Sequence, residues 1–247
     1  MMTRFQNKVV AITGGSDGIG LAAAKRFASE GAHVYVTGRR QGRLDEAAAE
    51  IGHGAVGIQG NVCSEQDLDR LYQRIGNDHG RLDVVFANAG ISESAPLGRI
   101  EAGHIDRLFD TNVKGTVFTV QKALPLMQAG GSIVLAGSGA GSKGFPALSM
   151  YSATKAAIRS LARTWTTDLK DRGIRVNVVS PGMILTPAMR SYLHANPGAE
   201  DGLKQMTPFG RIGDPDEVAR AVLFLASEES SFVAGDELFV DGGFLAV

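Results

Sequence analysis

The sequence contains very little cysteine, because Cys63 is the only one among 247 residues. A single cysteine excludes an intramolecular disulfide, so folding requires no oxidising compartment. The sequence also lacks an excess of charge of either sign, since 25 basic and 26 acidic side chains leave a net charge of -1. This balance gives no electrostatic reason to expect a nucleic acid as a partner.

Long apolar runs are missing as well. No stretch approaches the roughly 18 apolar residues that a membrane helix needs. The opening residues, MMTRFQNKVV, lack the apolar core of a signal peptide, so we expect a cytoplasmic protein without a membrane partner. The histidines lack the spacing of a metal site, and no metal is expected at His33, His53, His79, His104 or His194.

Short apolar, β-branched runs alternate along the chain with stretches whose apolar residues recur at helical spacing. Runs that are apolar on both faces are typical of a parallel sheet covered by helices on each side. The sequence therefore predicts an α/β fold: a single-domain, doubly wound parallel sheet of the Rossmann type, with helices on both faces, over residues 1–247. The predicted strands begin at Val9, His33, Ala55, Asp83, Ser132 and Ile174.

The stretch from residue 183 to residue 213 breaks this regular alternation. Pro187, Pro197 and Pro208 interrupt its weak helical patterns. Open α/β sheets bind their ligands beyond the carboxyl ends of the strands. We therefore expect residues 183–213 to form a substrate-covering segment at that end of the sheet.

A glycine-rich turn, TGGSDGIG, joins the first predicted strand to the first predicted helix. Gly14, Gly18 and Gly20 carry no side chains, so the backbone there can approach a pyrophosphate at the N-terminus of the helix. A turn that only connects a strand to a helix would have the same composition. Its position after the first strand of a βαβ unit favours the binding interpretation.

The second predicted strand ends in Gly38, Arg39 and Arg40. Many NAD enzymes have an acidic residue at this place, which binds the ribose 2′-hydroxyl. An arginine instead suits the 2′-phosphate of NADP(H), because a guanidinium forms charge-assisted hydrogen bonds with it. The sequence therefore favours NADP(H) over NAD(H), the alternative being a pair of solvated surface arginines.

Tyr151 and Lys155 stand four residues apart in a long helical pattern, so both side chains lie on one helix face. A phenol with a pKa of about 10 is a poor acid or base at neutral pH, but a nearby ammonium stabilises the phenolate and lowers that pKa. Ser138 follows a predicted strand and can hydrogen-bond the same substrate oxygen as Tyr151. As a hydrolase nucleophile Ser138 would need a GxSxG elbow, which its GSGAG context does not provide.

These residues together resemble the short-chain dehydrogenases/reductases, in particular NADP(H)-dependent bacterial alcohol dehydrogenases and 3-oxoacyl-thioester reductases. The resemblance covers nearly the whole chain, and the matching elements follow the order of the family. They are TGxxxGIG at Thr13–Gly20, NAG within Ala87–Gly90, Asn112 in TNVKG, Ser138, the Tyr151/Lys155 pair, Pro181–Gly182 and VDGG at Val240–Gly243.

The resemblance implies four catalytic roles. Tyr151 would act as the general acid in reduction and the base in oxidation, while Ser138 would orient and polarise the carbonyl. Lys155 would tune Tyr151 and hold the nicotinamide ribose, and Asn112 would position a water that relays protons to Lys155. The implied cofactor contacts are Gly14, Ser16, Asp17, Gly18, Ile19, Gly20, Gly38, Arg39, Arg40, Asn61, Val62, Asn88, Ala89, Gly90, Tyr151, Lys155, Pro181, Gly182, Ile184 and Thr186.

Three positions depart from the usual pattern of the family, and all of them concern the cofactor. Asn61 replaces an aspartate beside Val62 and still offers a donor and an acceptor to an adenine. Ala87 replaces the first asparagine of NNAG. Asp17 stands where some NADP(H)-preferring relatives have a basic residue, and its carboxylate would repel a 2′-phosphate.

The expected function is hydride transfer between NADP(H) and a small-molecule secondary alcohol or ketone. A 3-oxoacyl-thioester reductase is the alternative among enzymes, and it would present a basic surface to an acidic carrier protein. A catalytically silent cofactor-binding protein is the alternative of another class, although it would not need all four catalytic residues. Substrate specificity is expected in segment 183–213 and around Ser92, Ser94, Gly139, Phe145, Leu148 and Met150.

A homotetramer is the expected assembly. The helix after Tyr151 is rich in small residues that permit close packing between helices, and the family pairs this helix across subunits. These small residues could equally serve packing on the protein's own sheet. They are Ala153, Ala156, Ala157 and Ala162.

Overall fold

The computed structural model describes residues 4–247, and its centre is a seven-stranded sheet in which every neighbouring pair of strands is parallel. The strand order β3-β2-β1-β4-β5-β6-β7 reverses its direction of winding between β1 and β4. This is the doubly wound arrangement, and it confirms the predicted Rossmann-type fold. The strands are β1 (Val9–Thr13), β2 (His33–Gly38), β3 (Val56–Gln59), β4 (Leu82–Ala87), β5 (Met127–Ala136), β6 (Arg175–Pro181) and β7 (Glu237–Val240).

Two strands differ from the prediction by more than one residue at their start. β5 begins at Met127 rather than Ser132, because its first half is exposed and glycine-containing and so lacks the apolar pattern of a buried strand. β7 was not predicted at all. It lies at the edge of the sheet and has only four residues, ELFV, whose partial burial produces no continuous apolar run.

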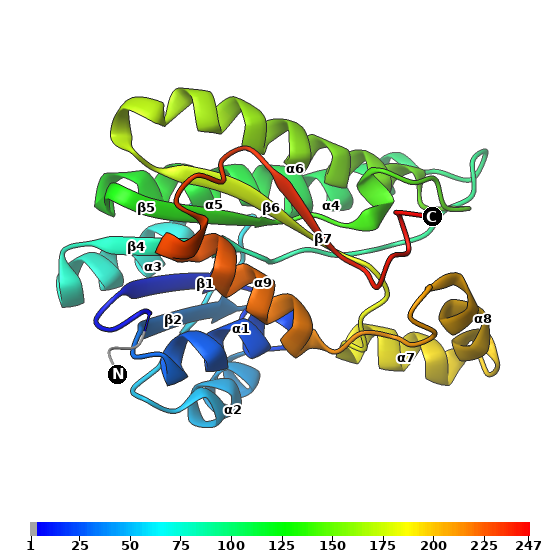
Figure 1. The fold of residues 1–247 in the computed structure, drawn as a ribbon, viewed down its shortest axis with the longest axis horizontal. Coiled ribbons are helices and arrows are strands. Elements are labelled where there is room, and N and C mark those ends of the chain that lie inside the picture. Colours follow the sequence, from blue (N-terminus) through cyan, green and yellow to red (C-terminus); the bar gives the residue numbers. More distant parts are fainter. Residues whose placement is uncertain (1–3) are drawn as a thin grey trace.

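Helices cover both faces of the sheet (Figure 1). One face is covered by α1 (Gly18–Ser29), α2 (Gln41–Ile51) and α9 (Pro215–Ala226). The other face is covered by α3 (Glu65–His79), α5 (Gly115–Ala123) and α6 (Ser149–Asp168), and α4 (Ala102–Phe109) packs beside α6.

The central strands supply both cores. In β1, Val10 and Ile12 belong to the core under α1, whereas Val9 and Ala11 belong to the core under α3. All four are at most 1% exposed. Full burial of a valine or isoleucine side chain contributes about 1.5–3 kcal/mol. The sequence shows apolar residues on both faces of the central strands because each of these strands contributes side chains to both cores.

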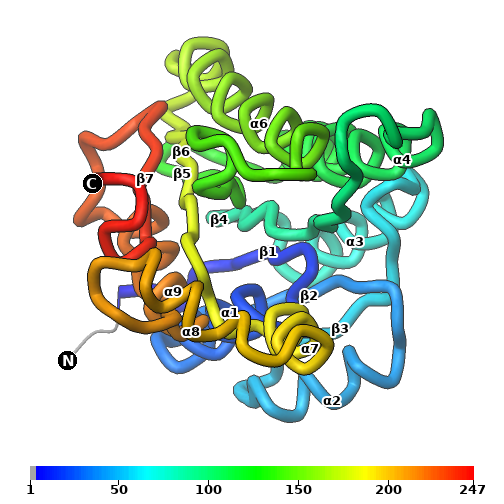
Figure 2. The backbone as a smooth tube through the Cα atoms, turned by 90° about the vertical axis from the view of Figure 1, so that its right-hand side faces the viewer, coloured from blue at the N-terminus to red at the C-terminus, as the bar shows by residue number. Residues whose placement is uncertain are grey.

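The segment from residue 183 to residue 213 lies beyond the carboxyl ends of the strands and contains α7 (Pro187–Ala195) and α8 (Ala199–Met206) (Figures 1 and 2). Its two ends are paired with each other. Gly213 N donates to Met183 O and Leu185 N donates to Gly213 O, both at 2.8 Å. The segment is therefore closed at its base. Within residues 4–247, none of the helices combines the length and the apolar character needed to cross a bilayer.

Candidate active site

A cavity of about 480 Å³ opens at the carboxyl ends of β1 to β4, on the side that segment 183–213 borders. In such sheets, ligands usually bind at the carboxyl ends of the strands, at the point where the winding reverses. Among the predicted cofactor contacts, fourteen line this cavity: Gly14, Ser16, Asp17, Gly18, Ile19, Gly38, Arg39, Arg40, Asn61, Val62, Asn88, Ala89, Gly90 and Thr186.

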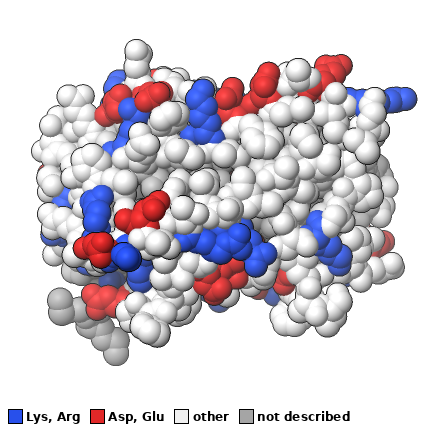
Figure 3. All heavy atoms as spheres, turned by 90° about the horizontal axis from the view of Figure 1, so that it is seen from above, with Lys and Arg blue, Asp and Glu red and all other residues white. Residues whose placement is uncertain are grey.

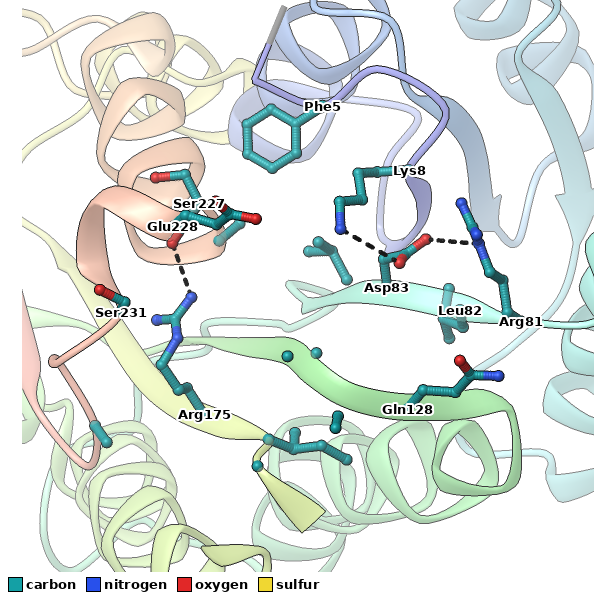
Figure 4. A pocket seen from close by; sticks show the side chains of 18 of the residues that line it. Phe5, Lys8, Arg81, Leu82, Asp83, Gln128, Arg175, Ser227, Glu228 and Ser231 are labelled. Carbon is teal, nitrogen blue, oxygen red and sulfur yellow. Dashed lines mark hydrogen bonds and ion pairs between the residues drawn. The ribbon is translucent and has the colours of Figure 1, made fainter.

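A larger cavity, of about 580 Å³, lies at the opposite, amino ends of the strands (Figure 4). Several of its charged side chains already serve the fold. Lys8 and Arg81 both approach Asp83, at 3.8 and 3.4 Å. Arg175 donates to the carbonyl oxygens of Leu225 and Ser227 at 2.9 Å and so caps the end of α9. The chemistry that the sequence predicts belongs to the carboxyl-end cavity instead.

The glycine-rich turn is shaped by close backbone contacts. Gly14 has a φ of +64°, and a Cβ there would lie 3.0 Å from the Asn88 amide nitrogen. A Cβ at Gly20 would lie 2.3 Å from Gly14 O, so this glycine packs helix against turn and does not line the cavity. Asp17, the N-cap residue of α1, makes no side-chain hydrogen bond to the first turn. The uncapped N–H groups and the bare turn fit a pyrophosphate.

Asn88 joins the turn after β1 to the end of β4. Its side-chain nitrogen donates to Thr13 O at 3.1 Å and to Gly14 O at 3.0 Å. Its backbone N–H donates to the Thr13 hydroxyl at 3.1 Å. Asn88 therefore holds the shape of the turn, in addition to lining the cavity.

Three arginines lie near the end of β2. Arg40 and Arg43 both approach the Asp17 carboxylate, at 3.6 and 3.5 Å. Arg39 is exposed, and its side chain forms no ion pair within the part of the chain that the structure describes. The sequence suggests that the negative charge of Asp17 would repel a 2′-phosphate. In the structure, two guanidinium groups lie near that carboxylate and offset its charge. Arg43 was missed because it follows the strand end by five residues, on α2.

Ser138, in the loop after β5, lies close to Tyr151 in the first turn of α6. Ser138 caps a short 3₁₀ turn, η3 (Gly139–Gly141), and its hydroxyl accepts from Ala140 N at 3.2 Å. Burial raises the pKa of Tyr151 above its ordinary value, and a hydrogen bond with Ser138 partly opposes that rise. The phenol therefore stays protonated at neutral pH, as a proton donor must.

Lys155 lies one helical turn after Tyr151 and is buried. Its ammonium donates to Ala136 O at 2.9 Å and lies 5.7 Å from the centre of the Tyr151 ring. Burial lowers the pKa of Lys155 to about 8. Burial is the main cause of the shift in the pKa of Tyr151, and the Lys155 ammonium is directed to the Ala136 carbonyl. That Lys155 lowers the pKa of Tyr151 stays a prediction.

Asn112 occupies a π-helical turn, η1 (Asp110–Lys114), between α4 and α5. Such turns occur frequently at functional sites. The Asn112 amide donates to Ile91 O at 2.9 Å and to the Thr154 hydroxyl at 3.1 Å, and its oxygen accepts from Ile91 N at 2.8 Å. A Cβ added to Gly90 would lie 3.2 Å from this oxygen and 3.6 Å from the Lys155 nitrogen. The Asn112 oxygen and the Lys155 nitrogen therefore both lie beside Gly90.

Other predicted cofactor contacts lie outside the cavity lining. Tyr151 and Lys155 belong to the catalytic cluster just described. Ile184 is 6% exposed and packs in the core under α1, where it pairs with Gly213. Gly20, Pro181 and Gly182 complete this group. Six further residues line the carboxyl-end cavity that were not predicted from the sequence. They lie close in sequence to predicted site residues: Thr37, Gly60, Ile91, Thr111, Pro187 and Ala188.

Comparison with known proteins places this site in a family. Residues 14–245 match the family described as "Enoyl-(Acyl carrier protein) reductase". Oxidoreductase asL5 of Sarocladium schorii is 49% identical over 99% of this chain and 98% of its own length. Cis-4-hydroxycyclohexanecarboxylate dehydrogenase of Sinomonas cyclohexanicum is 38% identical, over 98% of both chains. The 3-oxoacyl-[acyl-carrier-protein] reductase FabG of Thermotoga maritima is 37% identical, over 98% of this chain and 99% of its own.

Solved structures show the same relationship. Levodione reductase superposes with a TM-score of 0.94 at 30% identity, over 99% of this chain and all of its own. A structure described as a short chain dehydrogenase/reductase family protein superposes with a TM-score of 0.87 at 40% identity, again over 99% of this chain and all of its own. The chain therefore belongs to the short-chain dehydrogenase/reductase family of oxidoreductases, whose members bind nicotinamide cofactors and act on small molecules.

Proposed function

We propose that the protein is an NADP(H)-dependent oxidoreductase that interconverts secondary alcohols and ketones, with Ser138, Tyr151, Lys155 and Asn112 as its catalytic residues. One observation carries the proposal. A half-buried tyrosine, kept protonated by its surroundings, lies close to a serine and one helical turn from a buried lysine. This cluster follows β5, next to the cavity at the carboxyl ends of β1 to β4, and Gly90, which lines that cavity, lies beside Lys155.

Each side chain of the cluster has a part in the reaction. In reduction, Tyr151 donates its phenolic proton to the carbonyl oxygen, and the Ser138 hydroxyl donates a hydrogen bond to the same oxygen. A bound nicotinamide supplies the hydride to the carbonyl carbon, or removes it in oxidation. Oxidation uses the same groups in reverse, with the phenolate as the base.

The proton that Tyr151 gives up is replaced through Lys155 and Asn112. With a pKa of about 8, the Lys155 ammonium is charged at neutral pH and is still able to release a proton. Asn112 is held by three hydrogen bonds of its side chain and presents its oxygen near the lysine. A water placed there would connect Lys155 to solvent.

The cofactor preference rests on the arginines after β2. The turn residues Gly14 and Gly18 leave room for the pyrophosphate, and the start of α1 favours its negative charge. Arg39 would bind the 2′-phosphate of NADP(H) through charge-assisted hydrogen bonds, with Arg40 as a weaker neighbour. Since Asp17 is paired with Arg40 and Arg43, it leaves Arg39 unopposed.

Ring ketones are the substrates that we would test first. The relative from Sinomonas cyclohexanicum is named for a hydroxyl-bearing cyclohexane ring, and that relative is 38% identical over nearly the full chain. A 4-hydroxycyclohexane group is a secondary alcohol, which is the class that the Ser138–Tyr151 pair suits.

A 3-oxoacyl-thioester reductase is the second candidate, because the relative from Thermotoga maritima carries that activity in its name at 37% identity. Incubation of the protein with NADPH and either cyclohexanone or an acetoacetyl thioester, followed through the nicotinamide absorbance, separates the two. Turnover of the ring ketone supports the alcohol dehydrogenase assignment. Turnover confined to the thioester favours the second candidate, and cofactor binding without turnover of either would indicate a binding protein.

A homotetramer in the cytoplasm is part of the proposal. Ala153 and Ala156 are exposed on α6, as an interface between helices requires, whereas Ala162 is buried in the protein's own core. Seen from the side of α6, the surface has a broad area without acidic or basic side chains (Figure 3), and charged residues are depleted at the centre of interfaces. Light scattering should give about four times the chain mass of 26.0 kDa, and a mass of one chain would contradict the tetramer.

A further inference from the structure

The chain after β7 forms a hydrogen-bonded turn beside the loop that follows Ser138. The Asp241 carboxylate accepts from Gly243 N at 2.9 Å and from Leu245 N at 3.0 Å. Gly242 and Gly243 have φ values of +63° and +89°, a conformation that other residues rarely adopt. These contacts direct residues 241–247, which we call the C-terminal segment, to the end of the sheet where the strands terminate (Figure 1).

Phe244 fixes the C-terminal segment to the loop that follows Ser138. Its side chain is 3% exposed, and its ring stacks on that of Phe145 with centroids 5.6 Å apart and planes at 15°. The Lys143 ammonium lies 4.5 Å from the centre of the Phe244 ring and donates to Phe244 O at 3.3 Å. The stacked ring pair and the cation–π contact both hold the C-terminal segment against the loop that follows Ser138.

Leu245 lies against the residue that follows the catalytic serine. A Cβ added to Gly139 would be 3.1 Å from a Leu245 methyl carbon. Gly139 directly follows Ser138, and Ser138 lies close to Tyr151. The leucine side chain is half-buried, and so one part of it remains open to a neighbouring molecule.

The opposite side of the C-terminal segment contacts segment 183–213. Phe209 N donates to Gly242 O at 3.3 Å, and a Cβ on Gly243 would lie 3.2 Å from the Pro208 ring. The C-terminal segment therefore fills the space between the catalytic loop and the substrate-covering segment, so a substrate that approaches Ser138 passes close to it.

We propose that Leu245, held in place by the stacking of Phe244 on Phe145, is a specificity-determining residue that forms the wall of the substrate pocket next to Ser138. The wall limits the size of the group attached to the carbonyl carbon. This inference rests on the proposed reduction of ketones and adds to it the element that selects among them.

The test compares cyclohexanone with 4-phenylcyclohexanone in the wild type, Leu245→Ala and Leu245→Trp, with NADPH as cofactor. The ratio of kcat/KM for the bulky ketone to that for the small one should rise about tenfold in Leu245→Ala and fall about tenfold in Leu245→Trp, as expected when a few methylene groups change in an apolar pocket. The Kd of NADPH should stay at the wild-type value in both. Val247→Ala, at a residue that is 91% exposed, is the matched control and should leave the ratio unchanged.

A second pair of variants tests the contact itself. Gly139→Ala should displace Leu245 and lower kcat/KM for the bulky ketone, and Leu245→Ala in the same chain should restore it. If Leu245→Ala does not fold, Leu245→Val gives the same comparison with a smaller change. If the Leu245 variants bind NADPH, reduce cyclohexanone and keep the wild-type ratio of kcat/KM for the bulky ketone to that for the small one, this inference is wrong and the proposed function still stands. A folded wild type that binds NADPH and reduces neither ketone would overturn the proposed function and this inference with it.

Discussion

Replacing Arg39 by aspartate should turn a preference for NADPH into a preference for NADH. Arg39 lies directly after β2, lines the carboxyl-end cavity and forms no ion pair within residues 4–247. Its charge is therefore free for a 2′-phosphate. An aspartate at the same place would repel that phosphate and accept hydrogen bonds from the ribose hydroxyls of NADH.

The size of the effect follows from the charges around the cavity rim. Among the side chains that line the cavity, Arg39 and Arg40 carry two positive charges and Asp17 carries one negative charge, so the lining has a net charge of +1. The substitution changes that sum to -1 and removes the one arginine of the lining that has no ion-pair partner within residues 4–247. Hydrogen bonds to charged groups contribute about 1.5–3 kcal/mol. At about 1.4 kcal/mol for each factor of ten, kcat/KM for NADPH should fall about 10- to 100-fold.

The assay measures kcat/KM for both cofactors with one ketone at a fixed, low salt concentration, because screening weakens exposed charge interactions. Arg99→Asp makes the same change of charge at an exposed residue outside the cavity lining, and it should leave the cofactor ratio unchanged. Equal kcat/KM for the two cofactors in the wild type, unaltered in the Arg39 variant, would refute the reasoning and leave Arg39 as a solvated surface residue.

Three further predictions concern the catalytic cluster and the glycine turn. Tyr151→Phe should lower kcat by about 10²- to 10⁴-fold while the Kd of NADPH stays nearly constant, because only the transferable proton is lost; a variant that keeps more than half of a chemistry-limited rate would exclude Tyr151 as the acid. Ketone reduction should decline as pH rises through about 8, because Lys155 is charged below its pKa of about 8 and neutral above it; the decline should be absent from the residual rate of Lys155→Met, and the same decline in that variant would assign it to another group. Gly20→Ala should destabilise the fold by about 1–3 kcal/mol in urea unfolding and weaken NADPH binding, because its Cβ would lie 2.3 Å from Gly14 O. Gly42→Ala, on α2 with no atom within 4 Å of the new Cβ, is its control and should be neutral or stabilising.

Much of the fold and of the site was predictable because the signals are local in sequence. The strands of the centre are apolar on both faces, and the glycines of the turn and the Tyr151–Lys155 spacing are visible within a few residues. The surroundings of those groups were harder to predict from the sequence. The pKa of Tyr151 depends on how deeply the folded chain buries it, and the pairing of Asp17 with Arg43 joins two different helices. The spacing of residues in the sequence indicates neither the burial of Tyr151 nor the pairing of Asp17 with Arg43.

The C-terminal segment is the clearest case of information that resides only in three dimensions. Leu245 lies 106 residues after Gly139 in the sequence, yet the two touch. Phe244 and Phe145 are 99 residues apart, and of the two only Phe145 was expected from the sequence to lie near the substrate. The edge strand β7 brings them together, and it was itself missed because four half-buried residues give no strand pattern.

The pairing of Met183, Ile184 and Leu185 with Gly213 has a consequence for protein engineering. Because this pairing closes segment 183–213 at its base, the sheet does not depend on the length of chain between the paired residues. Gly198, between α7 and α8, has no atom within 4 Å of where a side chain would begin. Doubling the length of a flexible loop costs only about 0.6 kcal/mol of closure entropy. The turn at Gly198 is thus a place where a peptide, or a small reporter domain, can be inserted with little cost to the folded core.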